Sequence, residues 1–311
     1  MNQQAQVRRD LAEFRAELRG SAHDHQAWLQ CRTLRCLVDI TFDLSVIALA
    51  VAACARLGLW LAPLALLVIG NRQRSLGNIL HDGSHGNLSR RRWINDLILR
   101  VLLAPLLFES LTKYRRDHSR HHARLGDADG DPDFIRPIQG ECLLARLKLM
   151  VLDRRVWWAS FAADLGARDT GAGAWVTITG WWLALGTLVG QTVGWPALIL
   201  FASLWLLARA TVFHLITCFR ELCDHQGLTP GGIYSYTRDI VATGWRSWLF
   251  HPRNDGLHLT HHLLPGVPYH QLRVAQHAVR TFPSYRTRAQ LHADYAFASP
   301  AAAIPPLVTA G

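Results

Sequence analysis

The chain has 311 residues, half of them hydrophobic, and a formal net charge of +10 at pH 7. This length holds one or two domains and excludes a disulfide-stapled miniprotein. The six cysteines include no Cys-x-x-Cys pair and indicate scattered, reduced thiols. A basic protein can bind nucleic acid, anionic lipid or an acidic partner, but the long apolar runs described below favour a membrane protein over a nucleic-acid-binding one.

The N-terminal half begins with a polar segment and continues with a long apolar run. Residues 1–36 place Leu11, Phe14 and Leu18 among charges, which predicts a cytosolic amphipathic segment without the apolar region of a cleaved signal peptide. Residues 37–70 are almost wholly apolar, a run too long for one span of about 20 residues and short for two. We predict two transmembrane helices in a tight hairpin, at about 38–55 and 58–78.

A second pair of apolar segments follows, at about 174–193 and 196–213. Residues 71–125 between the pairs are strongly basic, and their apolar stretch 94–108 is too short to span and should lie along the interface. By the positive-inside rule, both hairpins put their basic flanks on the cytoplasmic side. We therefore predict an all-α integral membrane fold with four transmembrane helices, a membrane domain over 37–282, a tail over 283–311, and both termini in the cytoplasm.

Histidine clusters are the strongest chemical signal in the chain. On a helix, residues three and four apart share a face, so each cluster should point its imidazoles in one direction. A single metal ion needs about four to six ligands, so eight imidazoles suit two ions better than one. Eight of the sixteen histidines form three clusters with the spacings H-x-x-x-H, H-x-x-H-H and H-x-x-H-H: His81 and His85; His118, His121 and His122; His258, His261 and His262.

The identity of the metal depends on its ligand preferences. Imidazole binds iron, copper, zinc or nickel. A closed zinc site often takes thiolates, and a catalytic zinc would use only about three of these histidines. Two irons with open positions would use all eight and could reduce dioxygen, while copper remains open. A transporter or metal sensor is a different class, but it predicts ionisable residues inside the spans; here Asp39, Asp43 and Arg56 lie near the ends of the first hairpin.

The strings HDGSHGN (81–87), HSRHH (118–122) followed by DPDF, and HLTHHLLPGVPYHQL (258–272) resemble the three histidine boxes of the membrane fatty acid desaturase and hydroxylase superfamily. The resemblance runs from about 61 to 277. It implies a non-haem di-iron centre in a cytosolic helical cap and oxygen-dependent attack on an unactivated C–H bond. We expect an acyl-chain desaturase that forms a double or triple bond. The alternative is a hydroxylase or ketolase that acts on an acyl chain, an alkane or a carotenoid.

The resemblance also implies a further histidine between the second and third boxes. The string FRELCDHQG (219–227) makes His225 the best candidate, although Asp224 precedes it where the family pattern has glutamate, and His214 is a weaker one. Asn254 either acts through a water near the metal or caps the box-three helix. Carboxylates beside ligating histidines can fix the imidazole tautomer. The candidates for this role are Asp82, Asp117 and Asp224.

Partners follow from what the chain lacks and from its charge. It has no Gly-rich flavin or nicotinamide fingerprint, so a separate ferredoxin or cytochrome should supply electrons. An acyl lipid, acyl-CoA or acyl carrier protein is the expected substrate. A group of arginines could hold its phosphate or acidic carrier, or could simply reflect the positive-inside topology. This group comprises Arg90, Arg91, Arg92, Arg115 and Arg116.

Overall fold

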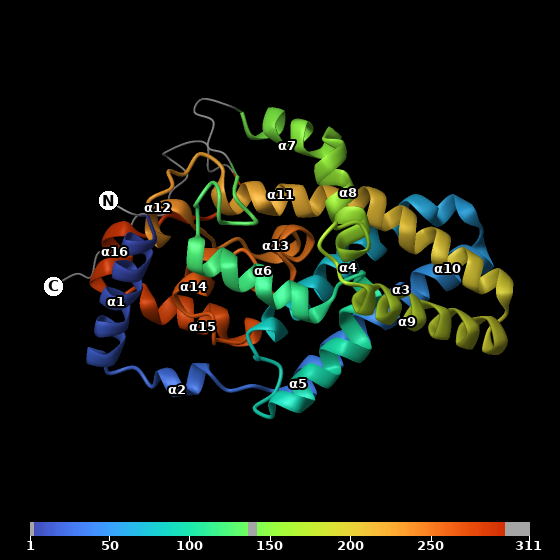
Figure 1. Cartoon of the computed structure of the whole chain (residues 1–311), viewed down its shortest axis with the longest axis horizontal. Coiled ribbons are helices and arrows are strands. Elements are labelled where there is room, and N and C mark those ends of the chain that lie inside the picture. The colour runs from blue at the N-terminus through green and yellow to red at the C-terminus, as the bar shows by residue number, and fades with distance from the viewer. Residues whose placement is uncertain (1–2, 136–141, 296–311) are drawn as a thin grey trace. The chain divides into compact units, whose positions relative to one another are not determined.

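A computed structural model describes residues 3–135 and 142–295 (Figure 1). The all-α expectation is confirmed, because in this part of the chain the only strands are β1 (Asp239–Ile240) and β2 (Leu291–His292), which pair in parallel. The predicted tail, 283–311, is described as far as residue 295 and there contains α16 (Pro283–Arg288) and β2; its remaining residues lie outside the described part. The chain forms two compact units: unit 1 comprises residues 1–31, 115–147 and 219–311, and unit 2 comprises residues 32–114 and 148–218.

Unit 2 is a bundle in which α4 packs against α3 and α10, and α10 also packs against α9 (Figure 1). Two tight connections depend on glycine, because Gly58 and Gly194 have φ of 113° and 108°, which other residues rarely adopt. These turns produce the two predicted hairpins. The elements of unit 2 are α3 (Thr33–Leu57), η1 (Leu59–Leu61), α4 (Ala62–Ser84), α5 (Arg92–Ile98), η2 (Leu99–Leu103), η3 (Pro105–Leu107), α8 (Arg154–Ala162), η4 (Ala163–Leu165), α9 (Ala172–Thr192), α10 (Trp195–Ala208) and η5 (Arg209–Phe213).

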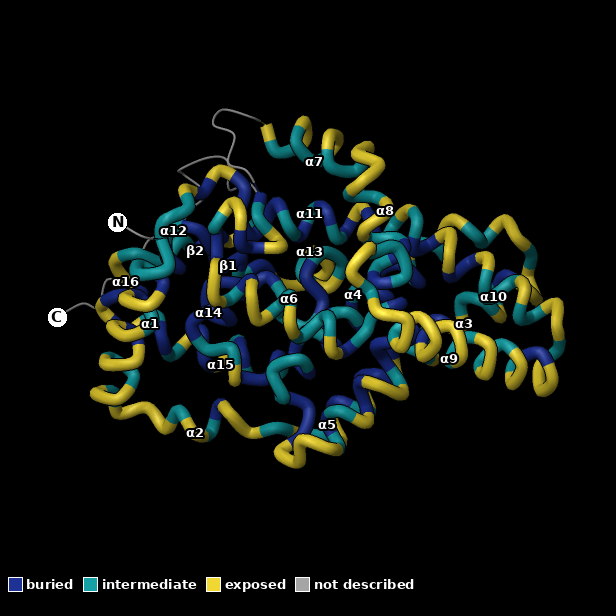
Figure 2. The backbone as a smooth tube through the Cα atoms, in the orientation of Figure 1, coloured by how far each residue is buried: buried dark blue, intermediate teal, exposed yellow. Residues whose placement is uncertain are grey.

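Three helical segments of the described chain are long and apolar enough to cross a membrane: His25–Leu57, Ala172–Thr192 and Trp195–His225. Figure 2 shows α9 exposed along most of its length, as expected of a helix that faces lipid. The fourth predicted span, 58–78, corresponds to α4 and is not among the three. The reason is its polar middle, Asn71 to Arg74.

The polar middle of α4 is buried inside unit 2 and has partners there. Nη1 of Arg72 lies 2.8 Å from Oδ1 of Asp43 on α3, and the hydroxyl of Ser75 donates to the same carboxylate at 2.6 Å. The side-chain amide of Gln73 donates to the carbonyl of Trp205 on α10 at 2.9 Å. Polar groups that face the interior of an apolar bundle and pair there are compatible with a membrane setting.

Unit 1 is built from short helices around a core that includes Phe14, Tyr236 and Leu259. Helix α1 packs on α12 and α16, where the buried Asp10 accepts a hydrogen bond from the backbone of Ile233 at 2.7 Å. The elements of unit 1 are α1 (Gln3–Gly20), α2 (His25–Trp28), α12 (Ile233–Tyr236), α13 (Gly244–Phe250), η6 (Pro252–Asn254), α14 (His258–Leu263), α15 (Tyr269–Val279) and α16 (Pro283–Arg288). Helices α6 (Leu111–Arg124), α7 (Leu143–Leu152) and α11 (His214–His225) contain residues of both units.

Candidate metal centre

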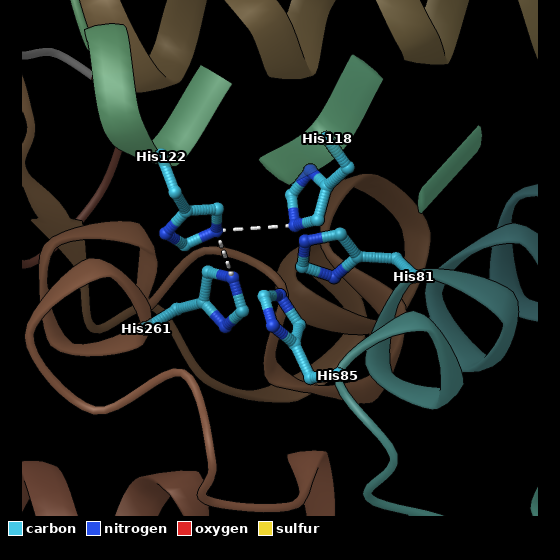
Figure 3. Close-up of side chains that lie close together, drawn as sticks. All are labelled: His81, His85, His118, His122 and His261. Atoms are coloured by element: carbon cyan, nitrogen blue, oxygen red, sulfur yellow. Dashed lines mark hydrogen bonds between the residues drawn. The ribbon is translucent and has the colours of Figure 1, made fainter. Parts of the chain in front are cut away.

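Six histidines of unit 1 converge from α6 and α14. The first group contains His118 and His122, one helical turn apart on α6, and His261 on α14. Nε2 of His122 lies 3.1 Å from Nε2 of His118 and 3.1 Å from Nε2 of His261 (Figure 3). The donor nitrogens of these three side chains all lie within 4.8 Å of one another. The helical spacing in the sequence thus produces a set of imidazoles that face a common point.

The second group consists of His121, His258 and His262, all buried. Nε2 of His262 lies 3.1 Å from Nε2 of His121 and 3.1 Å from Nε2 of His258. His121 and His122 are adjacent on α6 but belong to different groups, and the same holds for His261 and His262 on α14. Each H-x-x-H-H motif therefore contributes to both groups.

The spacing of these nitrogens suits ligands of a shared ion. Two imidazole nitrogens bound at about 2.1 Å to one ion lie roughly 3.0–3.4 Å apart in octahedral or tetrahedral geometry. The observed separations of 3.1 Å fall in that range. The donor set is all imidazole in these groups, and none of the six cysteines belongs to either of them. The two groups consequently fit two imidazole-rich metal sites.

The electrostatics of the second group favour neutral imidazole, the form that binds metal. Burial lowers the pKa of His258 and His262 well below the ordinary value, and the neighbouring histidines lower it further. For His121, burial also lowers the pKa, but hydrogen bonding to Asp131 and the nearby carboxylates outweigh this effect and raise it. Burial therefore lowers the pKa of all three histidines, and only for His121 do nearby carboxylates reverse the shift.

Asp131 is a site residue that the sequence prediction did not name. Its carboxylate accepts from Nδ1 of His121 at 2.7 Å and from the backbone amides of Gly126 and Asp133 at 2.7 and 2.9 Å. This arrangement leaves Nε2 of His121 directed at His262. The signal was present in the DPDF string after the second box, whose first aspartate is Asp131.

Asp239 on β1 is a second residue that the sequence did not reveal. Its fully buried carboxylate accepts from the backbone amide of Thr260 at 3.0 Å and from the hydroxyls of Thr260 and Tyr285. Burial raises the pKa of Asp239 to about 6, although these hydrogen bonds act in the opposite direction. Thr260 lies between the ligand candidates of α14, so this network fixes the helix that carries the third box. No sequence motif connects residue 239 with that box.

His225 ends α11 beside the second group. Its ring centroid lies 5.0 Å from that of His258, and its Nδ1 donates to the carbonyl of Tyr236 at 2.8 Å, which leaves Nε2 available. Asp224, also buried, places a carboxylate oxygen 3.6 Å from Nδ1 of His258 and 3.1 Å from Nε of Arg220. The structure thus places His225 and Asp224, two residues of the FRELCDHQG string, next to His258 of the third box.

Other predicted residues have different neighbours. The amide of Asn254 donates to the carbonyl of Tyr269 at 2.9 Å, and its oxygen accepts from Arg273 at 3.3 Å. The alternative that Asn254 caps the box-three helix is wrong, because the N-cap of α14 is Leu257. Asp82 accepts from Asn87 at 2.8 Å, a contact within unit 2. Asp117 pairs with its neighbour Arg116 at 3.0 Å.

The first box lies at the C-terminal end of α4 in unit 2. His81 is in the last turn and His85 is the C-cap residue, with ring centroids 5.5 Å apart in an edge-to-face arrangement (Figure 3). His214 also belongs to unit 2, but both of its ring nitrogens are engaged: Nδ1 with the hydroxyl of Ser160 at 2.6 Å, and Nε2 with the carbonyl of Val151 at 3.1 Å. The structure therefore gives His214 no free nitrogen for a metal.

The predicted arginines are mostly on the surface. Arg90, Arg91 and Arg92 are exposed, and Nε of Arg92 lies 3.6 Å from Asp96 one turn along α5. Arg116 is exposed and Arg115 is partly buried. This placement is compatible both with a partner surface and with plain positive-inside topology.

Comparison with known proteins identifies the family. The family model described as fatty acid desaturase matches residues 58–292. Dihydrorhizobitoxine desaturase of Bradyrhizobium elkanii is 29% identical over 277 residues, covering 80% of this chain and 76% of that protein. An sn-1 acyl-lipid omega-3 desaturase (ferredoxin) of Nostoc sp. (strain 36) is 22% identical over 262 residues, covering 76% and 73%. A beta-carotene ketolase of Haematococcus lacustris is 29% identical over 94 residues, covering 28% and 29%. The chain belongs to the fatty acid desaturase family and is an oxidoreductase, as its three histidine boxes predicted.

Proposed function

We propose that this protein is a membrane-bound, oxygen-dependent desaturase that holds two irons and introduces a double bond into an acyl chain. The observation that carries the proposal is the convergence of six histidines in unit 1 as two groups with Nε2 to Nε2 separations of 3.1 Å. Family membership adds the reaction class, because the relatives that cover most of the chain are named as desaturases.

The proposed ligands divide between two sites. His118, His122 and His261 would hold one iron, with His81 and His85 of the first box completing its ligand set. The other iron would be held by His121, His258, His262 and His225. When bound, the irons supply the activation of dioxygen needed to remove hydrogen from an unactivated C–H bond.

The chain's own residues prepare the imidazoles for these roles. Burial keeps His258 and His262 neutral, so their nitrogens are available without loss of a proton. Asp131 holds the Nδ1 proton of His121, and the carbonyl of Tyr236 holds that of His225. In both histidines Nε2 is left as the ligand atom.

The membrane setting and the electron donor are parts of the same proposal. We propose that α4 crosses the membrane as the fourth span with its polar residues turned inward, and that the histidine boxes and both termini are cytoplasmic. One relative is named as a ferredoxin-dependent enzyme, which favours a separate ferredoxin as donor over a cytochrome.

The second candidate is a hydroxylase or ketolase with the same metal centre, and the match to a beta-carotene ketolase favours it over part of the chain. Product analysis separates the two candidates. Full-length protein in membranes is supplied with ferredoxin, its reductase, oxygen and either acyl lipids or β-carotene. A desaturase yields a product that has lost two hydrogens, whereas a hydroxylase or ketolase yields one that has gained oxygen.

The metal centre is tested by His262→Ala, with His277→Ala as a matched control on the exposed side of α15. We expect about two irons per wild-type and control chain, and loss of iron and product in His262→Ala with unchanged membrane insertion. Elemental analysis and mass spectrometry measure both. One zinc per chain, or full turnover by His262→Ala, would contradict the proposal.

A further inference from the structure

Unit 2 contains a pocket of about 1080 Å³ that lies outside the histidine groups. It is lined by the start of α6, by α8, and by the connection between η4 and α9. The side chains that matter for its chemistry are Lys113, Arg154, Arg155, Trp158, Asp164 and Arg168. None of these residues was predicted from the sequence to bind a substrate or partner.

The inner wall of the pocket is fixed by hydrogen bonds. The carboxylate of Asp164 accepts from the backbone amide of Ser110 at 2.6 Å, and the backbone amide of Asp164 donates to the carbonyl of Phe108 at 3.1 Å. The indole of Trp157 donates to the carbonyl of Ala210 at 2.9 Å, which ties α8 to η5. The pocket is therefore held by three separate segments of the bundle.

The charge of the lining favours an anion. Four cationic side chains, Lys113, Arg154, Arg155 and Arg168, face two carboxylates, Glu109 and Asp164. Lys113 and Asp164 lie 3.3 Å apart and offset each other. Within residues 3–135 and 142–295, neither Arg154 nor Arg168 has a carboxylate at ion-pair distance, so these two guanidinium groups can bind an external anion. Arginine's planar fork matches the oxygens of a phosphate group.

The position of the pocket along the chain relates this anion to the membrane. Arg168 comes four residues before α9 (Ala172–Thr192), an exposed helix that is apolar enough to span. Trp158 is exposed on α8, and tryptophan is enriched at the boundary between membrane and water. The pocket thus combines the guanidinium groups of Arg154 and Arg168, the indole of Trp158 and a position just before the apolar helix α9. These features suit an amphiphile with an anionic head group.

We propose that this pocket binds the phosphate ester at the polar end of the acyl substrate, through Arg154 and Arg168. The inference rests on the proposed function, since it names the recognition site for the substrate of that reaction. A phospholipid head group and the phosphates of acyl-CoA share this chemistry and are the two sources to be distinguished.

The test measures binding directly on the purified full-length chain in detergent. The probes are phosphatidylglycerol, palmitoyl-CoA and, as an uncharged comparison, diacylglycerol. Arg154→Gln combined with Arg168→Gln removes the proposed forks. The control, Arg15→Gln combined with Arg19→Gln, removes the same charge from the exposed face of α1. Thermal unfolding verifies that both variants are folded.

We expect the pocket variant to bind phosphatidylglycerol or palmitoyl-CoA roughly ten- to a hundredfold more weakly than wild type, and diacylglycerol equally well. The probe that is weakened identifies the source of the phosphate. Equal loss in the control variant, or unchanged binding of both phosphate probes, overturns the proposal. If wild type forms no desaturated product yet the pocket variant loses binding, the proposed function fails while the pocket assignment stands.

Discussion

The carboxylate of Asp131 decides which nitrogen of His121 faces the other histidines. It accepts the Nδ1 proton at 2.7 Å and is itself held by two backbone amides, so the imidazole cannot turn without losing a buried hydrogen bond. The carbonyl of Tyr236 has the same effect on His225. At the residue scale, the partners of the imidazoles therefore matter as much as the imidazoles themselves.

The first prediction concerns this contact. Asp131→Ala should weaken metal binding about 10- to 100-fold, because His121 loses the acceptor that fixes its tautomer and orientation. The control is Asp129→Ala in the same loop, which removes an exposed carboxylate. Competition between the protein and a chelator for Fe²⁺ or Co²⁺ measures the affinity. Equal affinity in the two variants would show that Asp131 does not orient the site.

At the element scale, α4 carries two glycines, seven residues apart on the same face, whose surroundings differ. Its middle approaches η5 so closely that a Cβ on Gly70 would lie 2.6 Å from Cβ of Val212 and 2.9 Å from the backbone nitrogen of Phe213. A Cβ on Gly77, two turns further along, would meet no atom within 4 Å apart from the neighbouring residues and backbone of its own helix. The same residue type thus has a packing reason at one position and none at the other.

The second prediction uses this pair of glycines. Gly70→Ala should lower the free energy of unfolding by about 1–3 kcal/mol, because backbone atoms must move apart. Gly77→Ala should leave it unchanged or raise it by up to about 1 kcal/mol through helix propensity. Unfolding in detergent measures both. A larger loss in Gly77→Ala than in Gly70→Ala would contradict the packing of α4 on η5.

The third prediction concerns the ion pair between α3 and α4. Asp43→Ala leaves Arg72 buried without its carboxylate and should cost about 3–5 kcal/mol. Glu13→Ala, on α1, removes an exposed carboxylate that pairs with Arg288 at 2.6 Å and should cost only about 0.2–1 kcal/mol. The comparison is made by unfolding the two variants in the same detergent, and similar losses would refute the buried pair.

At the scale of the whole molecule, the exposed apolar surface of unit 2 needs lipid. Leu183, near the middle of α9, is 67% exposed although the segment is apolar enough to span a membrane. An isolated water-soluble bundle would leave this helix unfavourably hydrated. The exposure of α9 and its hydropathy therefore both indicate a helix that faces lipid.

The fourth prediction tests this face. Leu183→Lys places a charge near the bilayer centre and should disfavour insertion by about 2.5–3.5 kcal/mol. Ala16→Lys adds the same charge to the exposed side of α1 and should have no effect on insertion. Resistance of the protein to alkaline extraction from membranes is the measurement. Normal retention of Leu183→Lys would argue that α9 does not face lipid.

The sequence by itself determined the helical class, the apolar hairpins and the histidine ligand candidates. These depend on local patterns: hydrophobic runs favour span-like helices, glycines between the runs favour turns, and spacings of three and four are typical of side chains on one helix, as for His118, His121 and His122. The family resemblance was readable because its boxes are short contiguous strings. None of this requires knowledge of contacts between distant segments.

Only the tertiary structure decided how the local pieces combine. It assigned the adjacent histidines of the second and third boxes to different groups, engaged both nitrogens of His214, and bonded the side chain of Asn254 to the carbonyl of Tyr269. It also placed Asp239 on Thr260 and gathered Lys113, Arg154 and Arg168 around one pocket. The physical reason is that these contacts join residues from 15 to more than 50 positions apart, whose proximity depends on packing of the whole unit and leaves no periodic trace in the sequence.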